Sequence, residues 1–196
     1  MAEAIAPVVH GEDRRNYVIS VGLHALGATV SAALFGALLG IAGMGFGAPW
    51  GAAGVVVLLV VALLYGAREG VGLPVPIPDR KRQVPDWWRS FYSPAIAALL
   101  YGLGLGVGFM TYLTFGTFVA VAAAAVISGD PATAALLCAP FGLARGLSVL
   151  VAARTKRGET EVLVARLESL ATTAAPRIAN ALVLGALAAA AMLVLL

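Results

Sequence analysis

Arg145 is the residue whose type and position point most directly to chemistry. It lies nine residues before Arg154 in an otherwise apolar stretch, about 13 Å away along a helix. An ionised side chain at the centre of a membrane-spanning helix costs about 2.5–3.5 kcal/mol, and less near an end. One interpretation is that Arg145 meets an anionic ligand or a partner's carboxylate. The other, which we prefer, is that it reaches the cytoplasmic interface or donates to carbonyls freed near Pro140 or a nearby helix break.

Hydroxyl groups form a second candidate site. Thr111, Thr114 and Thr117 are spaced by three residues and share one face of a helix. Their hydroxyls could line a polar cavity or coordinate an ion, with Tyr101 and Tyr112 adding hydroxyls. The commoner behaviour of an intramembrane threonine is to bond a preceding carbonyl of its own helix.

The remaining reactive residues are few. His24 could handle protons, although a lone histidine is more often hydrogen-bonded in the packing. Cys138 is the only cysteine, so neither an internal disulfide nor a paired-cysteine redox site can form. His10 and His24 cannot build a metal site without other ligands. We find no hydrolase triad, metalloprotease motif, phosphate loop or carboxylate pair, so we expect neither an enzyme nor a bound cofactor.

The composition indicates a membrane protein. The chain has 196 residues, of which 61% are hydrophobic and 12% charged, whereas a soluble domain carries about 25% charged residues. Several uncharged apolar runs reach the length that spans a bilayer, which predicts an all-α, polytopic transmembrane bundle in one domain, residues 1–196. The net charge of +3 is spread over the loops, which indicates membrane orientation rather than nucleic-acid binding.

The long central apolar stretch, residues 93–128, is the feature that the other spans must position. As one helix it would be about 53 Å long, against about 30 Å for the hydrocarbon core of a bilayer. It contains a glycine ladder, GLGLGVG, where we expect the helix to break. A break frees backbone polar groups, so it must be buried in protein or face a cavity. The other spans are expected at 17–44, 51–66, 132–153 and 176–196, and none of the five contains Asp or Glu.

The connecting segments predict the orientation. Basic residues gather near the N-terminus, in the loop 67–92 and at 154–157, so these segments should be cytoplasmic. With 93–128 counted as one crossing, the chain makes about five crossings of the plasma membrane, with its N-terminus cytoplasmic and its C-terminus outside. Residues 158–171 should form an amphipathic helix on the membrane surface. Residues 1–16 do not have the pattern of a cleaved signal peptide.

Two sequence similarities bear on the fold. Residues 32–44 and 98–110 are identical at six of thirteen positions, as expected for an internal repeat of the kind that builds small transporters. Residues 102–153, with a glycine-rich helix, a break, an alanine-rich half-helix and a Ser-Gly turn, resemble the CcdA/DsbD-type membrane thiol-electron transporters. That family carries a Thr-Pro-Cys-x-x-Pro-like element at the break. Residues 112–117 here lack its cysteine and both prolines, so the resemblance implies a related fold and no thiol chemistry.

Two functions remain open. The first is a small transport protein of CcdA-like fold that passes a small solute or ion through a broken-helix cavity. The second is a non-catalytic accessory or assembly subunit of a larger membrane protein complex. We lean to the first because of the broken helix and the repeat, whereas the lack of intramembrane acids, paired cysteines and metal ligands favours the second. The expected partners are the lipid bilayer and either another membrane protein or a second copy of the chain.

Overall fold

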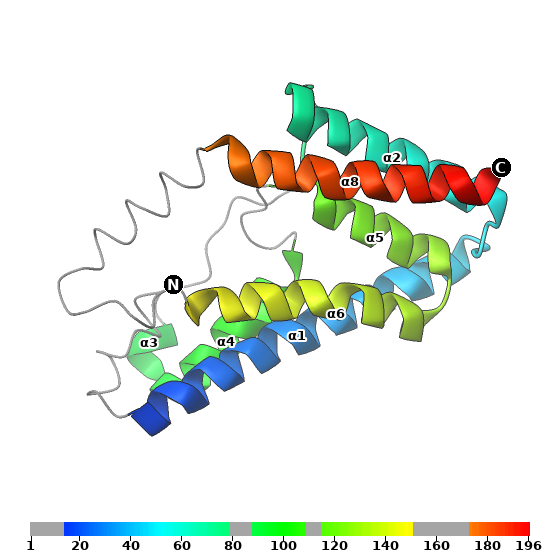
Figure 1. The fold of residues 1–196 in the computed structure, drawn as a ribbon. Coiled ribbons are helices and arrows are strands. Elements are labelled where there is room, and N and C mark those ends of the chain that lie inside the picture. Colours follow the sequence, from blue (N-terminus) through cyan, green and yellow to red (C-terminus); the bar gives the residue numbers. More distant parts are fainter. Residues whose placement is uncertain (1–13, 79–87, 109–114, 151–172) are drawn as a thin grey trace. The chain divides into compact units, whose positions relative to one another are not determined.

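The computed structural model describes residues 14–78, 88–108, 115–150 and 173–196. All regular secondary structure in these residues is helical (Figure 1), which confirms the predicted all-α class. The helices are α1 (Arg14–Gly45), α2 (Ala52–Val71), α3 (Trp88–Phe91), α4 (Pro94–Gly106), α5 (Thr117–Ser128), α6 (Pro131–Leu147) and α8 (Ala174–Leu195).

Four helical segments are long and apolar enough to cross a membrane. They are Arg15–Gly45, Ala52–Val71, Pro131–Leu150 and Ala174–Leu195, and the apolar helices α4 and α5 are shorter. Large aliphatic side chains remain exposed along these helices, for example Leu38, Leu63 and Leu182. In water such faces would be unfavourable, but against lipid tails they are expected. The protein is therefore a helical membrane protein.

The central stretch is broken, as its glycines predict. Helix α4 ends at Gly106 and α5 begins at Thr117, so no single helix runs through 93–128. Residues 109–114 lie outside the described residues, and so does the expected surface helix 158–171. The number of crossings and the orientation of the termini stay predictions.

The predicted end of the second span is wrong. Helix α2 continues past Gly66 to Val71 and is closed by Gly72, whose φ of 78° is left-handed and whose N–H donates to the carbonyl of Ala67. Glycine takes this conformation without steric cost, which is why it so often ends helices. The extension places Arg68 and Glu69 inside the helix. The expectation that no span contains an acidic residue is therefore also wrong.

The chain divides into two compact units, and each unit combines three separate stretches. Unit 1 comprises Met1–Ala32, Arg80–Tyr112 and Ala139–Thr172. Unit 2 comprises Ala33–Asp79, Leu113–Cys138 and Thr173–Leu196. Each of α1 and α6 contributes one half to each unit. The single domain over 1–196 stays a prediction.

Unit 1 is held together by glycines that let three helix backbones approach closely. A Cβ at Gly102 of α4 would lie 2.9 Å from the carbonyl carbon of His24 on α1, and its neighbour Gly106 packs in the same way on Ala28. On α6, a Cβ at Gly146 would lie 2.7 Å from the Cα of Ala25. The glycine ladder thus provides close helix contacts at Gly102 and Gly106, and Gly106 also ends α4.

Unit 2 is built around α2 and α8, which lie side by side and antiparallel (Figure 1). Gly66 faces Leu184 and Gly70 faces Ala181, so residue numbers rise along one helix as they fall along the other. Helix α5 contacts both. The second half of α1 packs on α6, where a Cβ at Gly40 would lie 2.8 Å from the carbonyl oxygen of Asp130. Gly36 and Gly40, four residues apart, thus form a packing face of small residues.

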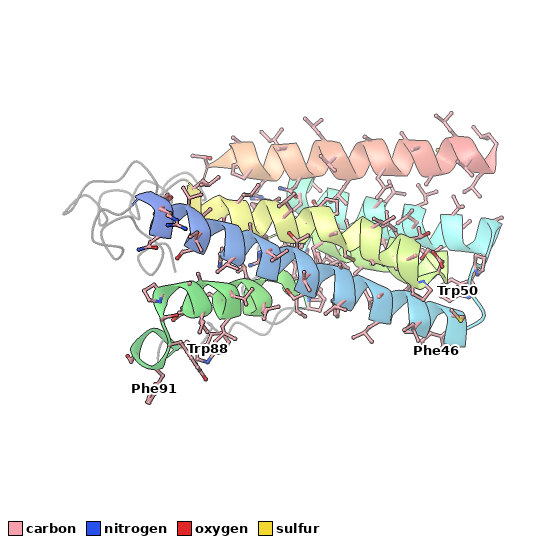
Figure 2. All side chains as sticks on the ribbon, turned by 90° about the horizontal axis from the view of Figure 1, so that it is seen from below. Phe46, Trp50, Trp88 and Phe91 are labelled. Atoms are coloured by element: carbon pink, nitrogen blue, oxygen red, sulfur yellow. The ribbon has the colours of Figure 1, made fainter. Side chains whose placement is uncertain are left out.

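One end of unit 2 is aromatic and the other is basic. Phe46 and Trp50 lie at the α1–α2 turn (Figure 2), and the indole N–H of Trp50 donates to the carbonyl of Phe46 at 3.1 Å. The α5–α6 turn packs at this same end, since Gly129 meets Ala48. Arg68, near the end of α2, and Arg177, near the start of α8, lie together at the other end of unit 2. There one guanidinium nitrogen of Arg177 donates to the carbonyl of Arg68 at 3.4 Å.

Candidate functional site

The predicted site residues fall into both units. His24, Tyr101 and Arg145 belong to unit 1, and Thr117 belongs to unit 2. Thr111 and Thr114 lie outside the described residues, so the shared hydroxyl face stays a prediction. The polar side chains are therefore best described unit by unit.

His24 joins two helices of unit 1. Its side chain is fully buried, and Nδ1 lies 3.0 Å from the carbonyl oxygen of Ala98 on α4. A carbonyl oxygen can only accept, so Nδ1 carries the proton and donates it. The histidine thus helps to fix α4 against α1. This is a role in helix packing, the commoner one for a lone histidine.

Tyr101 and Arg145 both make contacts with aromatic rings of unit 1. The ring of Tyr101 is buried and lies 5.7 Å from that of Trp88, centroid to centroid, so it anchors the short helix α3 on α4. The guanidinium carbon of Arg145 lies 5.5 Å from the ring centroid of Phe141, one turn earlier on α6. A cation at this distance from an aromatic face is attracted by its quadrupole. This contact is a further partner for Arg145, beyond those that the sequence suggested.

Glu69 is the central polar residue of unit 2, and the sequence reasoning missed it. Only 3% of its surface is exposed. Its carboxylate pairs with the guanidinium of the preceding residue, Arg68, and accepts the backbone N–H of Gly116 at 3.2 Å. Arg68 is itself held in place, because its Nε donates to the carbonyl of Val75 at 2.9 Å. A buried carboxylate is tolerated only with such partners.

The position of Glu69 also explains how α5 begins. The first N–H groups of a helix have no partner within it and carry partial positive charge. Gly116, the residue before α5, has no side chain that could cap them. A side chain there would clash, because its Cβ would lie 2.7 Å from Cβ and Cγ of Tyr65. Glu69 of α2 therefore provides the hydrogen-bond acceptor at the start of α5, in place of a side chain near Gly116 in the sequence.

Thr117 completes the connection between the helices of unit 2. Its hydroxyl donates to the side-chain oxygen of Asn180 on α8, and the Asn180 amide donates in turn to the carbonyl of Pro176 at 2.8 Å. Thr117 thus forms an interhelical hydrogen bond, whereas the sequence suggested either a bond to a preceding carbonyl of its own helix or a hydroxyl lining a cavity. We refer to Arg68, Glu69, Gly116, Thr117 and Asn180 as the Glu69 cluster.

The chemistry of the Glu69 cluster is that of a structural lock. Its carboxylate accepts from the guanidinium of Arg68 and from the backbone N–H of Gly116, which links α2 to the start of α5. Within the described residues, no group of three His, Cys, Asp or Glu side chains is placed to hold a metal ion. A signal for this cluster was present in the sequence, because Gly72 followed by prolines indicates a helix end beyond Glu69.

The fold and these contacts define a helical membrane protein whose interhelical seams use small residues and paired polar groups. No protein-family model and no solved structure match the chain. Three proteins similar to it are each named methylamine utilization protein MauF. The protein from Paracoccus versutus is 42% identical over 129 residues, covering 65% of this chain and 46% of the relative. Those from Methylorubrum extorquens and Paracoccus denitrificans are 38% and 37% identical, each over 66% of this chain and 46% and 47% of the relative.

These similarities correct one expectation. The chain spans just under half the length of the curated relatives it matches. The relatives are named MauF and not CcdA- or DsbD-type thiol transporters, so the resemblance inferred from residues 102–153 is wrong. The features that suggested it were an order of glycine- and alanine-rich segments. Close helix packing in a membrane selects such segments in many unrelated proteins.

Proposed function

We propose that this protein is a membrane-embedded accessory component of methylamine utilisation. The observation that carries the proposal is its 42% identity over 129 residues to the methylamine utilization protein MauF of Paracoccus versutus. This function corresponds to the second of the two hypotheses drawn from the sequence. The names of the relatives lend no support to the first, a transport protein.

The packing of the polar residues supports a non-catalytic role. Glu69, Thr117 and Asn180 bond to one another's helices, so their groups hold α2, α5 and α8 together. A solute pathway would instead use intramembrane polar groups to contact its cargo. An accessory subunit needs a stable helical scaffold within the bilayer, and the Glu69 cluster provides one.

The partners we propose are the lipid bilayer and a protein of the methylamine-utilising machinery. In unit 2 the end that carries Arg68 and Arg177 would face the cytoplasm, because basic residues are retained on that side. The end with Phe46 and Trp50 would lie at the outer interface, where aromatic rings are favoured.

A chimera tests the proposal directly. In Paracoccus versutus, the segment of the relative that matches this chain would be replaced by the matching residues of this chain. We expect the chimera to restore growth on methylamine to a strain that lacks the relative. Growth on succinate with ammonium, the native gene and an empty vector serve as controls. A chimera that reaches the native level in the membrane but leaves growth on methylamine absent would contradict the proposal.

A further inference from the structure

Among the buried polar atoms of unit 1, Oγ of Ser20 and Nε2 of His24 have no hydrogen-bond partner within the described residues. Ser20 is 1% exposed and His24 is 0% exposed, so bulk solvent does not reach them. Buried polar atoms in native proteins are nearly always bonded, and an exception often marks an ordered water or a ligand.

The hydrogen-bonding capacity of each atom is defined. Because Nδ1 of His24 donates to the carbonyl of Ala98, the neutral ring presents a lone pair at Nε2 and accepts there. The hydroxyl of Ser20 can donate. Other hydroxyls of α1 donate to carbonyls of their own helix, Thr29 to Ala25 at 2.7 Å and Ser31 to Ala28 at 3.3 Å. Ser20 departs from this behaviour, so its hydroxyl is available to another acceptor.

The spacing of the two residues suits one bridging molecule. Ser20 and His24 are four residues apart on α1, so they lie one turn apart on the same face of the helix, where their side chains are neighbours. The bridging molecule must accept from the Ser20 hydroxyl and donate to Nε2, and water does both.

We propose that Ser20 and His24 bind one ordered water molecule within unit 1. The neighbouring Val21, Ala98 and Val149 form an apolar cluster, against which Tyr17 also packs. The proposal rests on the contacts of unit 1 and is independent of the proposed function.

Solid-state ¹⁵N NMR of the histidine rings in proteoliposomes tests this proposal. A His10→Gln background leaves His24 as the only histidine in the full chain. We expect a protonated Nδ1, an unprotonated Nε2 whose resonance shows an accepted hydrogen bond, and magnetisation transfer from water to His24. Ser20→Ala should weaken the transfer and move the Nε2 resonance towards that of a free lone pair.

Ser31→Ala is the matched control, because Ser31 is another buried serine of α1 whose hydroxyl is already bonded within the helix. It should leave the Nε2 resonance unchanged. A proton found on Nε2 instead of Nδ1, the absence of water transfer in the parent protein, or equal effects of the two serine variants would each overturn the proposal. The parent protein alone decides the matter if Ser20→Ala does not fold.

Discussion

The two units bury polar side chains in opposite ways. In unit 2, Glu69 is bonded to Arg68 and to the N–H of Gly116, and Thr117 is bonded to Asn180. In unit 1, His24 uses one ring nitrogen to hold α4, while its second nitrogen and the hydroxyl of Ser20 have no partner in the part of the chain that the structure describes. A satisfied cluster fixes helices, whereas the unpartnered buried atoms of unit 1 are the basis for the water molecule proposed there. The difference between structural and binding residues therefore lies in their remaining hydrogen-bonding capacity.

Among single substitutions in the two units, removing the carboxylate of Glu69 should reduce the free energy of unfolding the most. Glu69→Ala leaves the partly buried guanidinium of Arg68 without its carboxylate partner and the N–H of Gly116 unsatisfied, and breaking a buried ion pair in this way costs about 3–5 kcal/mol. We expect a loss near the lower figure, because the side chain of Arg68 is 27% exposed. Reversible unfolding in mixed micelles measures the change in the free energy of unfolding.

The double variant Arg68→Ala/Glu69→Ala is the control for that measurement. If the two residues are coupled, it should lose less stability than the sum of the single variants. Strict additivity would show that Glu69 acts independently of Arg68 and would remove the main support for a structural lock.

A substitution at the close α1–α4 contact of unit 1 should cause the next largest loss of stability. In Gly102→Ala the added methyl group would meet the backbone of His24 and Ala28, which cannot move aside as a flexible side chain can. Overpacking of this kind costs about 1–3 kcal/mol. Gly185→Ala on α8 is the matched control, because no atom lies within 4 Å of a Cβ placed there, and it should be neutral or slightly stabilising. Melting temperatures in detergent that fall equally in both variants would refute close packing at Gly102.

A single hydroxyl of unit 2 should have a smaller effect. Thr117→Val removes the hydrogen bond to Asn180 and keeps the shape of the side chain. Interhelical hydrogen bonds in membrane proteins contribute about 0.6 kcal/mol on average and up to about 1.7 kcal/mol. Thr29→Val, which removes a bond within one helix, is the control. A loss at Thr29 as large as that at Thr117 would argue against an interhelical role for Thr117.

The smallest loss of stability is expected at Asp130, the exposed residue that caps α6. It contrasts with Glu69, whose buried carboxylate lies at the start of α5. Asp130 accepts the backbone N–H of Thr133 at 2.7 Å and so caps the start of α6. The hydrogen bonds from the side chain and backbone of Thr133 hold the pKa of Asp130 below its ordinary value. A lowered carboxyl pKa stabilises the fold above the unfolded-state value, about 3.9, and this contribution is lost as the pH falls through the folded-state value.

The difference in melting temperature between the parent protein and Asp130→Asn should therefore be present at pH 7 and shrink below about pH 4. Thermal melts at both pH values measure it. A difference that is unchanged over this range would mean that the charge of Asp130 does not contribute to the cap.

Patterns local in the sequence predicted most of the helices. Uncharged runs of spanning length identified four long helices, and the glycine ladder identified the break before α5, because both signals lie within one segment. The end of α2 was misplaced because charged residues were taken to mark a loop. Arg68 and Glu69 remain in the helix since they pair with each other and with residues outside α2.

The polar contacts could not be read from such patterns. Glu69, Gly116 and Asn180 belong to three segments that only the fold brings together, and no spacing in the sequence relates them. Likewise, the i, i+3, i+6 pattern placed Thr117 on a hydroxyl face but could not reveal Asn180 as its partner. His24 was recognised as a candidate, whereas Ser20 gained its significance from the absence of a partner for its hydroxyl among the described residues.

The accessory role is tested most directly by measuring methylamine uptake and growth in the same cells. In the Paracoccus versutus strain that lacks the relative, initial uptake of radiolabelled methylamine by intact cells should equal that of the parent strain, while growth on methylamine is lost. The chimera should restore growth without changing the uptake rate. A fall in initial uptake that parallels the loss of growth, and is reversed by the chimera, would contradict the accessory role and restore the transport hypothesis.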